Sequence, residues 1–128
     1  MPAEKYAALI EAAEKVRESA YAPYSGYKVG AALLSRDGRI FTGANMENAS
    51  YPAGLCAERS ALAAAISAGV RKFTALAVCA EGDVTPCGIC RQALAEFGDM
   101  WIICAAPGTA PKSYALSTLL PAAFQLKK

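Results

Sequence analysis

Three cysteines in two short stretches of the chain have the type and spacing of metal ligands. Cys56 lies in LCAERSAL, and Cys87 and Cys90 lie in TPCGICRQAL, each stretch at the expected beginning of a helix. Residues at positions i and i+3 of a helix share a face, and the positive end of the helix dipole favours the thiolate form. Because the chain contains no histidine, thiolates are the ligands left for a transition metal, and zinc suits them best.

Three thiolates leave one position of a tetrahedral zinc ion free, which is typical of a catalytic site and not of a structural one. A structural site needs a fourth ligand, and the other cysteines are Cys79 and Cys104. Both lie within apolar runs, LAVCA and WIICA, where a single cysteine is usually a small buried hydrophobic residue. We therefore expect a catalytic metal, with a structural zinc module closed by one of these two cysteines as the alternative.

Three charged residues follow the cysteines closely. Glu58 comes two residues after Cys56, near the expected metal but outside its ligand set. A carboxylate there can take a proton from metal-activated water, although the alternative is that it only complements the helix dipole. Arg59 directly follows Glu58, and Arg91 directly follows Cys90. We expect both arginines to donate hydrogen bonds to the sulfurs and so withdraw charge from the metal, unless they are solvated surface residues.

The hydrophobic pattern predicts the elements that must position these residues. Helices are expected at 6–20, 56–69, 87–98 and, capped by Ser117, 118–124. Strands are expected at 29–35, 40–46, 73–80, 100–106 and 113–116. The first two strands form a hairpin around Asp37 and Gly38. We expect a single α/β domain over residues 1–128, a three-layer α/β/α sandwich with a mixed five-stranded sheet that has an N-terminal antiparallel hairpin and later parallel strands.

Composition and charge exclude several classes of protein. Apolar residues make up 55% of the chain and charged residues 19%, which is typical of a globular domain. The net charge is +2 without a run of five like charges, so no nucleic acid polymer is expected as a partner. No apolar stretch approaches the roughly 20 residues that span a bilayer, and the acidic N-terminal segment lacks the pattern of a signal sequence. We therefore expect no membrane partner and a cytoplasmic location, where five cysteines are unlikely to form a disulfide framework.

Four blocks of the sequence resemble the small cytidine deaminases of the zinc-dependent deaminase superfamily. The blocks are YSGYKVGAALL, DGRIFTGANMENASYPAGLCAERSAL, PCGICRQALAEF and LLPAAF, and the resemblance extends over nearly the whole chain. It implies hydrolytic deamination of cytidine and deoxycytidine to uridine and deoxyuridine, with release of ammonia, in pyrimidine salvage. It assigns one Zn2+ per subunit to Cys56, Cys87 and Cys90, with a zinc-bound hydroxide attacking C4 of the base and Glu58 moving the protons.

The same resemblance implies a set of substrate contacts. Asn45 and Glu47, in the stretch NMEN, match the family's ribose-binding pair, and Ala57 belongs to the expected substrate-binding set. Tyr27 stands where the family often has phenylalanine against the substrate, so its hydroxyl is expected either to contact the sugar or to reach solvent. Ile89 replaces a small residue between the paired cysteines and is expected to tighten the pocket near the leaving amine.

The resemblance also implies a homotetramer in which a C-terminal aromatic residue of one subunit closes over the base in another. Phe124, in LLPAAF, is the matching residue, and the alternative is that it anchors the last helix. A positive mean hydropathy of +0.24 agrees with surface that is hidden between subunits. The alternative enzyme is a related deaminase of another aminopyrimidine, such as blasticidin S. The NMEN stretch argues against it, because that class differs at the sugar contacts.

Overall fold

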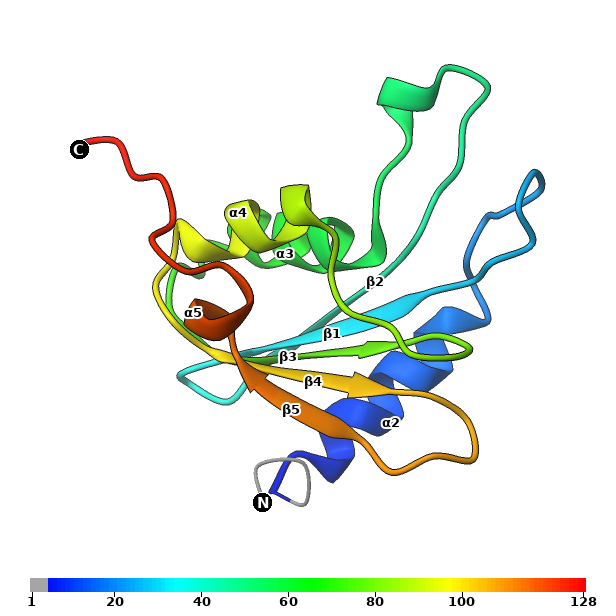
Figure 1. Ribbon diagram of the computed structural model, residues 1–128, viewed down its shortest axis with the longest axis horizontal. Helices are drawn as coiled ribbons and strands as arrows, with labels where there is room; N and C mark the ends of the chain where they lie inside the picture. The colour runs from blue at the N-terminus through cyan, green and yellow to red at the C-terminus, as the bar shows by residue number, and fades with distance from the viewer. Residues whose placement is uncertain (1–4) are drawn as a thin grey trace.

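The structure, a computed structural model, describes residues 5–128, and its centre is one mixed sheet (Figure 1). The strands are β1 (Gly30–Ser35), β2 (Ile40–Ala44), β3 (Phe73–Cys79), β4 (Trp101–Ala105) and β5 (Lys112–Ala115). The helices are α2 (Ala7–Arg17), the 3-10 helix η1 (Tyr51–Ala53), α3 (Ala57–Ser67), α4 (Gly88–Ala95) and α5 (Leu116–Leu119). All five expected strands are therefore present.

The strands are arranged in the order β2-β1-β3-β4-β5. The β1–β2 hairpin is antiparallel, as predicted, and it turns at Gly38, whose φ of +94° few other residues adopt. β3 and β4 are parallel and are connected through α4, while β5 returns antiparallel to β4. The connection between β4 and β5, residues 106–111, is too short for the crossover that a parallel pair requires. The sheet is thus mixed, as expected.

Helices cover both faces of this sheet. α2 lies on one face, and α3, α4 and α5 lie on the other (Figure 1). The three central strands, β1, β3 and β4, alternate between the two resulting cores, so that Leu33 and Leu76 pack with the residues of α3 and α4 while Ala32 and Ala75 pack with those of α2. The predicted three-layer α/β/α sandwich is confirmed.

Two glycines allow the helices to lie directly on the hairpin. A Cβ atom on Gly43 of β2 would stand 2.3 Å from the backbone N of Ala61 in α3. A Cβ atom on Gly30 of β1 would stand 2.1 Å from the carbonyl O of Ala13 in α2. Real Cβ atoms do not approach other atoms this closely, so the close packing of α3, which carries the expected catalytic residues, depends on a glycine at position 43.

The ends of the chain differ from the prediction. α2 ends at Arg17 and not at residue 20. The last helix is the single turn α5, whose N-cap is Ala115, so Ser117 lies inside it and not at its cap. Pro121 cannot continue the helix and disfavours helical backbone in Leu120, which has a φ of −138°. Within residues 5–128, no helix combines the length and the apolar character needed to cross a bilayer.

Candidate active site

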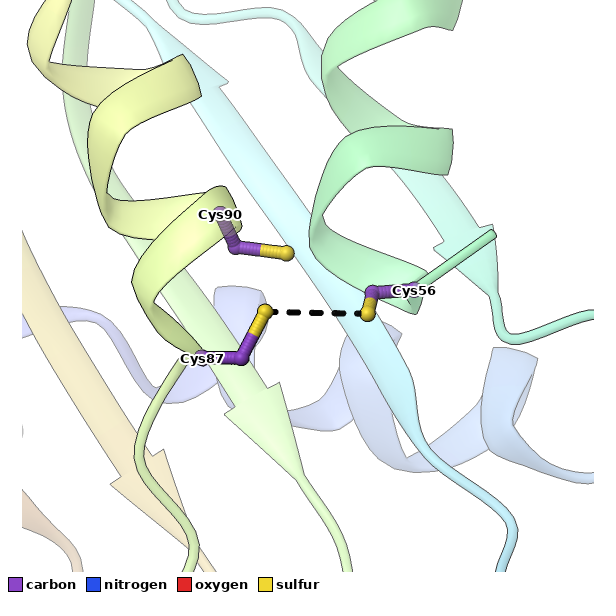
Figure 2. Close-up of side chains that lie close together, drawn as sticks. All are labelled: Cys56, Cys87 and Cys90. Carbon is purple, nitrogen blue, oxygen red and sulfur yellow. Dashed lines mark hydrogen bonds between the residues drawn. The ribbon is translucent and has the colours of Figure 1, made fainter. Parts of the chain in front are cut away.

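The three predicted ligand cysteines meet at the N-termini of two helices. Cys56 is the N-cap of α3, Cys87 is the N-cap of α4, and Cys90 lies in the first turn of α4. Figure 2 shows their sulfurs pointing toward one another, and all three Sγ atoms lie within 4.8 Å of each other. The Sγ atoms of Cys56 and Cys87 are 3.9 Å apart. Two thiolates on a tetrahedral zinc ion, with Zn–S bonds of about 2.3 Å, are separated by about 3.8 Å, so this set fits zinc.

The remaining cysteines do not join this group. Cys79 is 1% exposed in the core beneath α2, and Cys104 is 7% exposed in the core beneath α3 and α4. Neither belongs to the cluster of possible metal ligands found within residues 5–128. The ligand set is therefore three cysteines, as a catalytic site requires, and the fourth cysteine of a structural module is not supplied.

Hydrogen bonds at the site favour a thiolate at Cys56. The neighbouring Cys90 and Arg59 together lower the pKa of Cys56 to about 5 in the metal-free chain, although burial opposes the shift. In the metal-free chain, the proximity of Cys56 and burial raise the pKa of Cys90, so Cys56 is the first of this pair to lose its proton. Arg59 Nη2 donates to Cys56 Sγ at 3.5 Å, so the hydrogen bond predicted from this arginine to a sulfur is present.

Glu58 is buried beside the sulfurs, in the first turn of α3. Its side chain is only 5% exposed. Burial raises the pKa of its carboxyl, and the negative charge of Cys56 raises it further against the opposing effect of Arg59. An acid that merely complemented a helix dipole would be solvated and would have a lowered pKa. A buried carboxyl with a raised pKa is instead suited to taking up and releasing a proton, as acid–base catalysis requires.

Arg91 does not contact the sulfurs, so the prediction of its hydrogen bond is wrong. Its Nε donates to the carbonyl O of Pro86 at 2.7 Å, and its Nη1 donates to the carbonyl O of Leu119 at 2.8 Å. Its Nη2 donates to Thr85 Oγ1 at 3.1 Å. The guanidinium thus fastens the segment that leads into Cys87 to the end of α5.

An open pocket of about 460 Å³ connects the metal-binding end of α3 with the expected sugar contacts. Its lining includes Cys56 and Arg59 from the metal-binding end and Asn45 and Glu47 from the expected sugar contacts. The remaining lining residues are Tyr24, Ser25, Met46, Asn48, Tyr51, Gly54 and Leu55. Residues predicted from two distant motifs therefore share one cavity, although Glu58, Cys87 and Cys90 are not among its lining residues.

Glu47 and Asn45 also hold the loop that precedes β1. Glu47 accepts hydrogen bonds from the backbone N–H groups of Tyr24 and Ser25, at 2.9 and 3.1 Å, and from the hydroxyl of Ser25. The hydroxyl bond lowers the pKa of Glu47 and outweighs the effect of desolvation, so the side chain is ionised. Asn45 accepts from the N–H of Val29 at 2.8 Å. Both side chains keep free hydrogen-bonding capacity for a ligand.

The sequence did not reveal this use of the loop residues. The nitrogen of the same Asn45 amide, Nδ2, donates to the carbonyl O of Tyr27 at 2.9 Å. The hydroxyl of Tyr27 donates to the carbonyl O of Glu81 at 2.9 Å. Tyr27 is not among the residues that line the pocket of the single chain. The turn residues of PYSGY were the only signal that this segment bends toward β2.

Three further predicted residues lie outside the pocket lining. Ala57 is fully buried at the first position of α3. Ile89 is 66% exposed and does not line the pocket, so the expected tightening near the leaving amine is not found in the single chain. Phe124 is 68% exposed and follows α5, so it does not anchor the last helix.

Comparisons with known proteins agree with this site. Residues 3–106 match the family model for the cytidine and deoxycytidylate deaminase zinc-binding region. A probable cytidine deaminase from Dictyostelium discoideum is 40% identical over 127 residues, which cover 97% of this chain and 86% of that protein. A cytidine deaminase from Mycobacterium tuberculosis is 44% identical over 117 residues, which cover 89% of this chain and 85% of that protein. The crystal structure of cytidine deaminase from Burkholderia pseudomallei matches with a TM-score of 0.89 and 47% identity, covering 93% of this chain and 98% of that one.

Proposed function

The chain belongs to the cytidine deaminase family, and from this premise we propose that it deaminates cytidine and deoxycytidine to uridine and deoxyuridine. The observation that carries the proposal is the shared pocket, in which hydrogen-bonding groups for a sugar face the metal-binding end of α3. Asn45 and Glu47 offer an amide and a carboxylate to the ribose hydroxyls. A base attached to that sugar extends toward Cys56 and Arg59.

Each group at the metal-binding end has a chemical task. Cys56, Cys87 and Cys90 hold the zinc ion, which supplies the Lewis acidity that lowers the pKa of water at the site. Glu58 takes a proton from this water and delivers it to N3 of the pyrimidine, while the water oxygen bonds to C4. A second proton passes through Glu58 to the amino group, the C4–N4 bond breaks, and ammonia leaves. One water is consumed, nothing is oxidised, and Glu58 returns to its initial state.

Arg59 adjusts the charge of the ligands. Three thiolates carry more negative charge than a zinc ion carries positive charge, which weakens its Lewis acidity. The hydrogen bond from Arg59 to Cys56 withdraws part of that charge. We place Arg91 in a different role, as a clamp on the segment before Cys87, because its hydrogen bonds go to Thr85, Pro86 and Leu119.

The proposed assembly is a homotetramer in which Phe124 of one subunit closes the base pocket of another. Three observations support it. The pocket is open on the single chain, and Phe124 is exposed and is not among the residues that line the pocket. Several other large apolar side chains are exposed as well, among them Tyr51 at 87% and Leu126 at 72%.

Ala57 and Tyr27 remain proposed substrate contacts.

The experiment that tests the function measures ammonia release and zinc content together. Purified protein is supplied with cytidine, deoxycytidine, cytosine or blasticidin S. We expect turnover of the two nucleosides and about one zinc per chain. Zinc-loaded protein that turned over neither nucleoside would overturn the proposal, and turnover of blasticidin S alone would assign the chain to the alternative aminopyrimidine class.

A further inference from the structure

The segment after α5 is fastened to α4 along its length. Gln92 Nε2 donates to the carbonyl O of Phe124 at 2.9 Å. Before the segment, Arg91 Nη1 holds the carbonyl O of Leu119, and at its end Lys128 Nζ lies 3.1 Å from Glu96 Oε2. These contacts all come from the helix that carries two of the three metal-binding cysteines, or from its C-cap. The C-terminal segment is therefore attached to α4, the helix that begins at the metal-binding cysteines Cys87 and Cys90.

The backbone around Phe124 is fixed, although its ring is not packed. Ala122 has a φ of +51°, and it is the only non-glycine residue with positive φ within residues 5–128. Such a conformation costs a non-glycine residue roughly 1–2 kcal/mol, so the anchoring contacts must offset it. The ring of Phe124 is nevertheless 68% exposed. An exposed apolar ring on an anchored backbone is suited to contact with another surface, because binding then costs less conformational entropy of the backbone.

The ring does not serve the pocket of its own chain. Figure 1 shows the C-terminal end of the chain at the opposite end of α4 from the N-termini of α3 and α4, where the cysteines lie. Phe124 is also absent from the lining of the pocket that contains Cys56 and Arg59. In the proposed assembly, the surface that receives the ring belongs to a second copy of the chain.

We propose that Gln92 is a positioning residue, whose hydrogen bond to the Phe124 carbonyl sets the direction of the ring that enters a neighbouring subunit's pocket. The proposal rests on the proposed function, in which Phe124 closes that pocket. Gln92 stands two residues after Cys90 on α4. One helix thereby holds the metal of its own subunit and the aromatic wall of another subunit's site.

The test substitutes Gln92 by methionine, which has a similar length but cannot donate the hydrogen bond. We expect KM for cytidine to rise about 2- to 10-fold, the range that corresponds to one net hydrogen bond, while kcat and zinc content stay unchanged. Phe124→Ala should raise KM at least as far, and the double variant Gln92→Met/Phe124→Ala should be no worse than Phe124→Ala alone. Gln125→Met is the matched control, since no hydrogen bond of the Gln125 side chain is found within residues 5–128, and its KM should stay at the wild-type value.

Backbone 15N order parameters of residues 122–126 report on the tether independently of activity. We expect these order parameters to fall in Gln92→Met and to stay unchanged in Gln125→Met. An unchanged KM in Gln92→Met beside a raised KM in Phe124→Ala would overturn the proposal, as would unchanged order parameters in Gln92→Met or a double variant whose KM is higher than that of Phe124→Ala. Failure of the wild-type protein to deaminate cytidine would instead overturn the proposed function, while the order parameters would still decide whether Gln92 fixes the segment.

Discussion

The Sγ atoms of Cys56 and Cys87 lie 3.9 Å apart, although 31 residues separate them in the chain. Each cysteine is the N-cap of a helix, and both have extended backbone, with ψ of 151° and 168°. An N-cap side chain projects back over the free N–H groups of its own helix. Two helices that begin side by side therefore bring their first side chains together, with Cys90 completing the set one turn further along α4.

The first prediction concerns which cysteines hold the metal. We expect Cys87→Ala to lose zinc, because the two remaining thiols cannot form a tetrahedral site with adequate affinity. Cys79→Ala and Cys104→Ala should keep about one zinc per chain, since neither sulfur belongs to the cluster. Metal analysis of the purified variants after dialysis against a chelator measures this. Loss of zinc in Cys104→Ala would contradict the three-cysteine site.

The second prediction concerns Glu58. Glu58→Gln should retain zinc but lose about 10²- to 10⁴-fold in kcat, because glutamine fits the buried position and cannot carry a proton. Steady-state ammonia release, with zinc measured on the same sample, gives both quantities. Glu11→Gln, the same change on the exposed side of α2, is the matched control and should behave as wild type. Full activity in Glu58→Gln would refute the proton-transfer role.

The third prediction separates the two arginines that the sequence placed in one class. Arg59→Ala should lower kcat by about 10-fold or more with a smaller loss of zinc affinity, because it removes the donor to Cys56. Arg91→Ala should mainly lower the melting temperature, since it removes three hydrogen bonds that clamp the segment before Cys87. Kinetic assays, zinc titration and thermal unfolding of both variants check the contrast. Equal effects of the two substitutions on kcat would show that the distinction is wrong.

The core of the site could be predicted from sequence because helical spacing fixes direction. Cys87 and Cys90 had to share a face of one helix, and an acid two residues after Cys56 had to lie in its first turn. The resemblance then supplied Asn45 and Glu47, which the structure places in the same pocket. The strands and the mixed sheet followed from their apolar runs and from the glycine turn of the hairpin.

The roles of Arg91, Gln92 and Gly43 could not be predicted, because they depend on contacts between segments that are distant in a single sequence. Arg91 and Arg59 occupy similar positions after a key residue, but their side chains leave the helices in different directions and meet different partners. The tether from Gln92 to Phe124 joins residues 32 apart through a backbone carbonyl, a group that every residue has. Gly43 was not recognised as a packing residue, because only the structure shows α3 against it.

The fourth prediction tests that packing. Gly43→Ala should destabilise the protein by about 1–3 kcal/mol or more, because its Cβ would stand 2.3 Å from the backbone N of Ala61 and 2.7 Å from the carbonyl O of Ala57. The helix must move away from β2 to accept the methyl group, and Glu58 moves with it. We therefore expect a lower kcat together with the lower stability in urea unfolding. Gly88→Ala adds the same methyl group where nothing lies within 4 Å, so its free energy of unfolding should not fall.

The fifth prediction concerns the acid dependence of stability at the start of α5. Asp99 Oδ1 accepts from the backbone N–H of Ser117 at 2.9 Å and from that of Met100 at 3.0 Å, and Asp99 Oδ2 accepts from the Ser117 hydroxyl at 2.8 Å. Partial burial acts to raise the pKa of Asp99, but these hydrogen bonds together outweigh it and lower the pKa below its ordinary value of 3.8.

A lowered pKa in the folded state means that the ionised carboxylate stabilises the protein above pH 3.8 and that this contribution is lost as the pH falls through the folded-state pKa. Because Asp99 is exposed and solvent screens its charge, Asp99→Asn should reduce the free energy of unfolding by only about 0.2–1 kcal/mol at pH 7, and the difference from wild type should shrink below pH 3.8. Urea unfolding of both proteins from pH 7 to pH 3 measures it. Asp83→Asn, which removes a carboxylate from a solvent-exposed ion pair with Lys112, should leave the free energy of unfolding nearly unchanged. A difference between Asp99→Asn and wild type that stayed constant with pH would show that the charge of Asp99 contributes nothing.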